Sequence, residues 1–189
     1  LQSLKIKPDN PDAFLNLGII YKNLGLLEEA LNSMTKSLTL NPNNPDAYLV
    51  LGGIHKDLGK LDEAVDSIIK LIELKPDNSD AHMTLAGIYK DLGDNDLALT
   101  SALKALKLKP DDPNIYNNCA NLLLLNDEPK KSIAFYEQAL RINPNCRSAM
   151  SGNGRALKKI GESHEGIKLL RKGDGHANID INLGLTVYK

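Results

Sequence analysis

Apolar and small residues recur every three or four positions through most of the chain, as in Phe14, Leu17, Gly18, Tyr21 and Leu24. This spacing is typical of an amphipathic helix that buries one side. The pattern returns every 34 residues, and the copies end at Pro8, Pro42, Pro76, Pro110 and Pro144. Such a period indicates stacked copies of one unit, because a unit this short cannot bury its apolar face alone.

Each unit is predicted to contain two antiparallel helices. The first begins with a capping side chain followed by a proline, as in Asn10-Pro11 and Asn44-Pro45, where the missing N–H of proline costs nothing. We expect this helix to end at Gly25, Gly59, Gly93 and Gly161, because glycine accepts the left-handed conformation of a helix cap. The second helix of the first unit is predicted from about Glu28 to Leu40.

The period also predicts how the chain is divided. Residues 1–10 complete a truncated upstream repeat, and five units follow at 11–44, 45–78, 79–112, 113–146 and a divergent 147–172. Residues 173–189 form a tail in which Ile179, Ile181, Leu185 and Val187 alternate around a turn, so we expect a short hairpin that caps the array or begins another domain. Because the chain starts midway through a helix, it looks like a piece of a longer protein.

Small residues occupy matching positions of the two helices. Gly18, Gly52, Ala86, Ala120 and Gly154 share one column, and Ala30, Ala64, Ala98 and Ser132 share another. Facing small residues let two helix backbones approach closely. We therefore interpret both columns as packing positions.

These features together resemble the tetratricopeptide repeat family. The resemblance rests on the 34-residue unit, on the segments 14–21 and 48–52, on the alanine that opens the second helix and on the closing proline. The resemblance covers about residues 1–172, and the chain is most similar to bacterial arrays of this family. It implies an all-α fold, a right-handed superhelical solenoid of antiparallel helix pairs whose first helices line a concave groove, and a role in holding partner proteins.

The last two units depart from the family pattern. Asn126 and Asp127 replace the usual turn of the fourth unit, and Pro129 starts its second helix. The fifth unit has Asn153, Gly166, Gly173 and Asp174 in apolar or alanine columns. We expect weaker packing in that unit.

The candidate groove lies on the side of the first helices opposite to the packed columns. At 100° per residue, Leu15, Asn16, Ile19 and Lys22 project there if Leu17 and Tyr21 point inward. The equivalent residues of later units that we assign to a partner-binding groove are Leu49, Lys56, Met83, Lys90, Asn117, Asn118, Asn121, Arg155 and Lys158. Apolar residues dominate the early units and amides the later ones, and exposed apolar surface commonly marks an interaction site.

The polar members of this set admit two readings. Asn117, Asn118 and Asn121 can hold the backbone of an extended peptide, or they are solvated or locally bonded side chains. Arg155 and Lys158 can attract an acidic partner, or they form an ordinary charged end face.

Some relatives hold a terminal carboxylate with a lysine-asparagine clamp, which we do not expect here, because Asn117 and Gly152 stand at two of its positions. The pairs Lys56-Asp57 and Lys90-Asp91, with Lys22 before them, predict a ladder of weak ion pairs between adjacent repeats.

Composition narrows the partners and the chemistry. A formal net charge of -1 gives no global field for nucleic acid or an anionic membrane, so neither is an expected partner. No apolar run reaches the length of a membrane span, and Cys119 and Cys146 lack metal-ligand spacing, which favours a cytoplasmic protein. No cofactor or metal is expected.

Catalysis is not expected either. His55 and His82 occupy aromatic packing columns, Cys119 an inward leucine column, and no phosphate-binding or nucleophile motif is present.

The predicted function is therefore a non-catalytic scaffold that binds a peptide or protein segment. The alternative is the substrate-recruiting arm of a larger enzyme, because similar bacterial arrays are often joined to glycosyltransferase, methyltransferase or oxygenase domains. The incomplete first unit also leaves a face through which two copies can pair.

Overall fold

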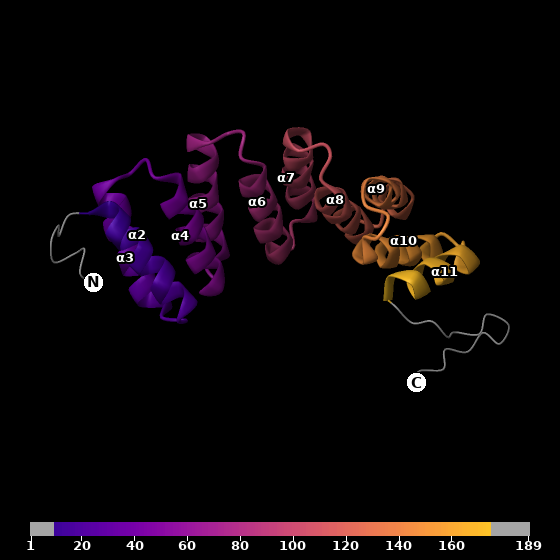
Figure 1. Cartoon of the computed structure of the whole chain (residues 1–189), viewed down its shortest axis with the longest axis horizontal. Helices are drawn as coiled ribbons and strands as arrows, with labels where there is room; N and C mark the ends of the chain where they lie inside the picture. The colour runs from indigo at the N-terminus through magenta and orange to yellow at the C-terminus, as the bar shows by residue number, and fades with distance from the viewer. Residues whose placement is uncertain (1–9, 175–189) are drawn as a thin grey trace. The chain divides into compact units, whose positions relative to one another are not determined.

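The computed structural model describes residues 10–174 of the chain. Within that range the fold is all-α, with ten helices and no strand, which confirms the predicted fold class. The helices form two compact units divided after Asp94 (Figure 1). We call residues 10–94 the N-terminal unit and residues 95–174 the C-terminal unit. The first two residues of the tail predicted at 173–189 belong instead to the last helix, which ends at Asp174. The rest of that tail, with its predicted hairpin, and residues 1–9 of the upstream repeat end predicted at 1–10 lie outside the described residues.

Each unit contains five helices. The N-terminal unit holds α2 (Pro11–Asn23), α3 (Leu27–Leu40), α4 (Pro45–Asp57), α5 (Leu61–Leu74) and α6 (Ser79–Leu92). The C-terminal unit holds α7 (Asn95–Leu108), α8 (Pro113–Leu125), α9 (Pro129–Ile142), α10 (Arg147–Lys159) and α11 (Ser163–Asp174).

Successive helices pack in the same way in both units. In the N-terminal unit α3 lies against α2 and α4, and α5 lies against α4 and α6. In the C-terminal unit α8 lies against α7 and α9, and α10 against α9 and α11. Within the units, α3, α5 and α9 therefore each pack between their own first helix and that of the next repeat.

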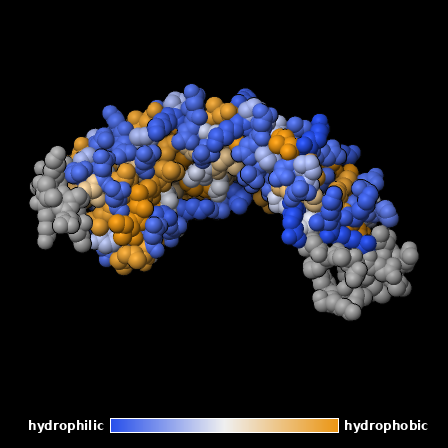
Figure 2. Space-filling view, viewed as in Figure 1, coloured by the Kyte–Doolittle hydropathy of each residue, from blue (hydrophilic) through white to orange (hydrophobic). Residues whose placement is uncertain are grey.

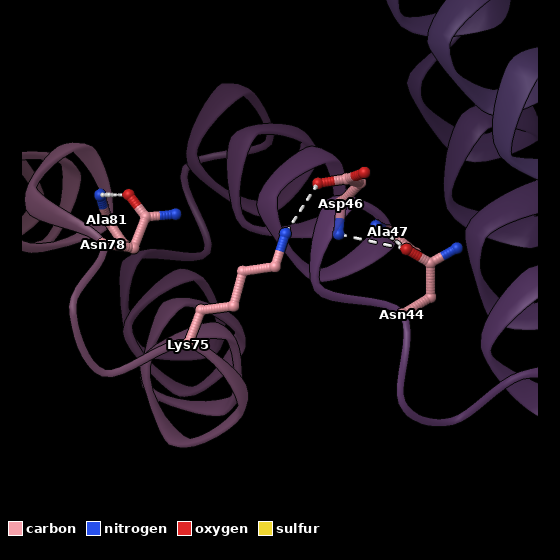
Figure 3. A network of polar contacts seen from close by, with 6 residues as sticks. All are labelled: Asn44, Asp46, Ala47, Lys75, Asn78 and Ala81. Atoms are coloured by element: carbon pink, nitrogen blue, oxygen red, sulfur yellow. Dashed lines mark hydrogen bonds and ion pairs between the residues drawn. The ribbon is translucent and has the colours of Figure 1, made fainter.

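Side-chain caps start most of the first helices (Figure 3). The Asn44 Oδ1 accepts hydrogen bonds from the backbone N–H groups of Asp46 and Ala47, at 3.1 and 3.3 Å, and Asn10 repeats this arrangement one unit earlier. Asn78 and Asp112 cap α6 and α8 through one such bond each. Helix α10 differs, because Cys146 stands at its N-cap and makes no capping bond.

The predicted glycine ends of the first helices are confirmed. Gly25, Gly59, Gly93 and Gly161 have φ between 73° and 93°, a conformation that other residues rarely adopt. In the fourth repeat the same place is taken by Asp127 at φ 59°. The irregular sequence of that turn therefore preserves the backbone geometry with a short polar residue, which tolerates the left-handed region better than most.

The small-residue columns are points of close helix contact. A Cβ added to Gly52 would lie 2.7 Å from Ile68 Cδ1. One added to Gly154 would lie 2.6 Å from the Gly166 carbonyl oxygen, and one added to Gly166 would lie 2.7 Å from that of Gly154. The fifth repeat therefore brings α10 and α11 backbone to backbone, so the expectation that Gly166 loosens this repeat was wrong.

The apolar core follows the alternation of the helices. In the N-terminal unit Met34, Ile54, Ala30 and Ala47 form one buried cluster, and a second contains Ala64, Ile68, Leu71, Ala81, Leu85 and Ile88. In the C-terminal unit Tyr136 is buried with Ala120, Ala139, Cys146, Ala149 and Ala156.

One predicted core residue lies outside. Leu24 was expected to point into the stack, but it is 67% exposed, and Ile20 is 53% exposed although Ile54 in the same column is fully buried. Ile54 belongs to the buried cluster that contains Ala30 and Met34 of α3, whereas no helix of the described residues precedes α2. Apolar surface therefore gathers over the first hairpin (Figure 2).

Candidate functional site

Ion pairs hold the first helices of the N-terminal unit side by side. Lys22 on α2 pairs with Asp57 on α4 at 2.9 Å, and Lys56 on α4 pairs with Asp91 on α6 at 2.8 Å. The hydrogen bond from Lys56 lowers the pKa of Asp91. For each unit separately, we use the term open face for its predicted groove residues and the other residues in their columns, which include Gly53 and Gly87 in the N-terminal unit and Ser151 in the C-terminal unit.

Apolar side chains of the open face differ in how far they are exposed. Leu49 is 43% exposed, and Ile19 and Met83 are half-buried. Leu15 is also half-buried, but it packs against the cluster of Met34 and Ile54. The expectation that Leu15 stands free on the surface was therefore wrong, and part of this side chain stabilises the fold.

Two glycines lie among these apolar residues. A Cβ added to Gly87 would meet nothing within 4 Å, so this glycine fills no packing requirement. At Gly53 the added atom would lie 3.0 Å from Lys22 Cε. The Lys22 side chain therefore passes over Gly53 to reach Asp57, and the absence of a side chain at residue 53 leaves room for it.

The lysines predicted for the groove are mostly engaged in structure. Lys22 and Lys56 make the ion pairs described above, which are exposed and contribute about 0–1 kcal/mol each. Lys90 and Asn16 are exposed. In the N-terminal unit the open face is thus an apolar surface bordered by two paired lysines and by Lys90.

In the C-terminal unit the three asparagines of α8 have different surroundings. Asn118 is exposed. Asn117 is 9% exposed, and its Oδ1 is buried without a hydrogen-bond partner. Asn121 is half-buried, and its Oδ1 accepts a 2.7 Å hydrogen bond from the Tyr136 hydroxyl of α9. The structure thus brings together two of the predicted amides and one residue that was not predicted.

Basic residues follow on α10. Arg155 and Lys158 are both exposed, and neither forms an ion pair within the described residues. Their neighbour Lys159 pairs with Asp127 at 2.6 Å. Helices α8 and α10 are in contact. The stem of Lys158 lies near α11, because a Cβ added to Gly166 would be 2.9 Å from Lys158 Cγ.

Tyr136 could not be assigned to this surface from the sequence. It lies in the column of Met34 and Ile68, both fully buried core residues, and it is itself fully buried. The only signal was Gly152, whose missing side chain leaves room for the tyrosine: a Cβ there would lie 2.7 Å from the Tyr136 hydroxyl.

The three side chains predicted to serve packing, His55, His82 and Cys119, contact or lie among neighbouring residues of the helices. His55 Nδ1 lies 3.1 Å from both the Glu63 carbonyl oxygen and the Ser67 hydroxyl, and His82 Nε2 lies 3.2 Å from the Pro76 carbonyl oxygen. Cys119 is fully buried, and burial raises the pKa of its thiol to about 12. No group of three or more metal-ligating side chains occurs among residues 10–174.

None of the helices that the structure describes is both long and apolar enough to span a bilayer.

Comparison with solved structures shows the fold. The chain is similar to a crystal structure of MamA, with 21% identity, 95% of this chain and 98% of that chain covered, and a TM-score of 0.79. It is also similar to a crystal structure of YrrB, described as a TPR protein with an unusual peptide-binding site, with 18% identity, coverages of 92% and 90%, and a TM-score of 0.75. A solved structure of PilF from Pseudomonas aeruginosa is similar too, with 20% identity, coverages of 90% and 78%, and a TM-score of 0.74. A comparison with curated proteins gave no match.

Family models give the same result from the sequence. Models described as tetratricopeptide repeat match residues 1–32, 25–88 and 113–146, and one described as TPR repeat matches 86–127. Together they extend over residues 1–146 without a gap. With the helix pairs and glycine-mediated contacts described above, they show that this chain belongs to the tetratricopeptide repeat family.

Proposed function

We propose that the chain is a non-catalytic interaction scaffold that holds a segment of a partner protein against the open face. Tetratricopeptide arrays generally serve as protein-interaction domains, and the structurally similar YrrB is described as having a peptide-binding site. The observation that carries the proposal is the combination of exposed Leu49 and half-exposed Ile19 and Met83 with the open space above Gly87.

This combination is costly for the isolated chain. A glycine inside a helix is less favourable than alanine by about 1 kcal/mol, and Gly87 receives no compensating contact. Because residue 87 has no side chain, a partner segment can approach the α6 backbone closely there and contact the neighbouring apolar side chains. Because the helices are packed before the partner arrives, little additional ordering is required on binding.

The test uses an array of acetylated and amidated random peptides of about nine residues, which extend over about 30 Å. Three variants each place a larger or charged group on the open face: Leu49→Lys, Gly87→Leu and Asn118→Leu. Gly87→Ala is the matched control, since it changes the same residue with little added volume. We expect peptides captured by the wild type and the control to be lost with at least one of the three variants. Unchanged peptide capture by all three variants, or no capture by the wild type, would refute the proposal that the open face binds the partner segment.

A further inference from the structure

Charge is divided unevenly between the two units. Residues 10–94 contain 7 basic and 13 acidic residues, a net charge of -6, whereas residues 95–174 contain 13 basic and 9 acidic residues, a net charge of +4. The chain-wide charge of -1, on which the expectation of no membrane partner was based, therefore conceals a basic unit.

The last turns of the second helices differ between the units in the same sense. Basic residues occupy this turn in all three second helices of the C-terminal unit, with Lys107 in α7, Arg141 in α9, and Arg171 and Lys172 in α11. Helices α3 and α5 of the N-terminal unit have no basic residue there. A cation stabilises a helix C-terminus, but α3 and α5 form without one, so this local role does not account for the difference.

Second helices of successive repeats have the same direction, so their last turns lie along one edge of the unit. We use the term basic edge for the last turns of α7, α9 and α11. Lys107, Arg141 and Lys172 are exposed, and none of them forms an ion pair within residues 10–174. Even Glu137, one turn before Arg141 on α9, makes no ion pair with it. These three cations are therefore available to an anionic partner.

The loop after α9 adds a further cation at the end of the edge. Arg147, the first residue of α10, is exposed, and its Nε donates a 2.9 Å hydrogen bond to the Gly173 carbonyl oxygen in the last turn of α11. This bond holds the Arg147 side chain beside Lys172.

Exposed aliphatic side chains alternate with these cations. Leu108 directly follows Lys107 and ends α7, and Ile142 directly follows Arg141 and ends α9. Each of the two aliphatic residues is 36% exposed. Neighbouring cationic and aliphatic side chains suit the boundary between lipid headgroups and acyl chains, where the charged end meets a phosphate and the apolar part contacts hydrocarbon.

The aromatic residues of this unit argue against two other kinds of partner. Within residues 95–174, Tyr136 is buried, and Tyr116 and Phe135 are half-buried against the same core cluster. No exposed ring is therefore available to stack on the bases of a single-stranded nucleic acid or to anchor a protein interface.

We propose that the basic edge of the C-terminal unit binds a membrane surface that contains anionic phospholipids. Lys107, Arg141 and Lys172 pair with headgroup phosphates, and Leu108 and Ile142 contact the outer part of the acyl chains. This binding is peripheral and goes beyond the scaffold function, because it uses the second helices and leaves the open face of the first helices to the partner segment.

The experiment measures co-sedimentation of the full chain with two kinds of vesicle. One is made of phosphatidylcholine alone, and the other contains about 30% phosphatidylglycerol. We expect binding to the anionic vesicles to be at least about tenfold tighter than to the neutral ones at about 50 mM salt, and to weaken strongly at about 500 mM salt, because exposed charges are screened.

Two double variants test the cations. Lys107→Gln combined with Arg141→Gln is expected to weaken binding to the anionic vesicles about 25-fold, or about fivefold for each cation. Lys36→Gln combined with Lys70→Gln is the matched control, since it removes the same charge from α3 and α5 of the N-terminal unit. We expect the control to bind within about twofold of the wild type.

A second matched pair tests the aliphatic residues. Ile142→Ser is expected to weaken binding to the anionic vesicles about threefold. Leu74→Ser is the control, because Leu74 ends α5 at the equivalent position of the N-terminal unit and is 37% exposed. Its binding is expected to match that of the wild type.

Equal binding to the two kinds of vesicle, equal losses in the two double variants, or unchanged binding of Ile142→Ser would each overturn this inference. Tighter binding of a single-stranded oligonucleotide than of vesicles at equal phosphate concentration would overturn it in favour of nucleic acid. Pairing of two copies at low salt that disappears in the Lys107→Gln, Arg141→Gln variant would assign the edge to the acidic unit of a second copy instead. None of these results bears on peptide capture by the open face.

Discussion

Two glycine-to-alanine substitutions separate the packing role of glycine from its conformational cost. Gly87 and Gly154 both lie inside first helices, on α6 and α10. A methyl group at Gly87 meets nothing within 4 Å, whereas at Gly154 it would lie 2.6 Å from the Gly166 carbonyl oxygen and 3.0 Å from the Leu170 backbone nitrogen. The chemical change is identical, but the surroundings are opposite.

The expected magnitudes follow from these contacts. Replacing a helical glycine by alanine raises the free energy of unfolding by about 1 kcal/mol where the space is free, so Gly87→Ala is expected to stabilise its unit by that amount. At Gly154 the same gain is opposed by overpacking, which costs about 1–3 kcal/mol and here acts against backbone atoms that cannot rotate away. The propensity gain is common to both sites, so the difference between the variants, about 1–3 kcal/mol, measures the helix contact alone.

Native-state hydrogen exchange is the appropriate assay, because a repeat array need not unfold in one step and the two glycines lie in different units. We expect slower exchange of the most protected α6 amides in Gly87→Ala and faster exchange of the α10 and α11 amides in Gly154→Ala. Equal shifts of the same sign at both sites would show that helix propensity alone decides. The close approach of α10 and α11 would then have no measurable energetic role.

Two further predictions concern caps and ionisation. Asn44→Ala removes two capping bonds from α4 and is expected to lower the free energy of unfolding, measured by urea denaturation, by about 1 kcal/mol. Asn43→Ala is the control, and equal urea midpoints of the two variants would contradict the assigned cap. The pKa values of Cys119 and Tyr136 are raised in the folded chain from 9.0 and 10.0 to about 12, so their contribution to stability is complete below pH 9 and is lost as pH rises from 9 to 12. Urea midpoints that fall over this range in the wild type and fall less in Cys119→Ala would support the buried thiol, whereas rapid alkylation of Cys119 in the folded chain at pH 8 would contradict it.

The fold could be predicted from local residue patterns because the same residue types recur at equivalent positions of successive repeats. The caps at Asn10 and Asn44, the left-handed glycines and the small-residue contact at Gly52 all depend on neighbours within one or two helices. The exposure of Leu24 was missed because this column lies at the end of the first helix, where Leu92 and Ile160 are also exposed, so helical spacing alone did not show its depth.

The open face was predicted less completely because it depends on contacts between side chains of different repeats. The spacing of the α8 asparagines placed them on one side of the helix, but it did not reveal that Asn117 is buried or that a core tyrosine reaches Asn121. Similarly, helical periodicity indicates which side of the helix Leu15 lies on but not how deeply its side chain is buried. Leu15 was therefore expected on the surface, whereas it packs partly against the core. In the fifth repeat, Gly166 in an alanine column suggested a gap between the helices. Here the backbones of α10 and α11 approach each other closely at this residue and fill that space.

Position-specific photo-crosslinking tests the central claim most directly. A photoreactive amino acid is placed singly at Leu49, Gly87 and Asn118 on the open face, and at the exposed residues Lys36, Lys70 and Lys104 on the second helices. The chain is then irradiated with the peptides selected on the array, and adducts are located by mass spectrometry. The account predicts adducts from the open-face positions and few from the second helices, whereas adducts confined to Lys36, Lys70 and Lys104 would contradict it.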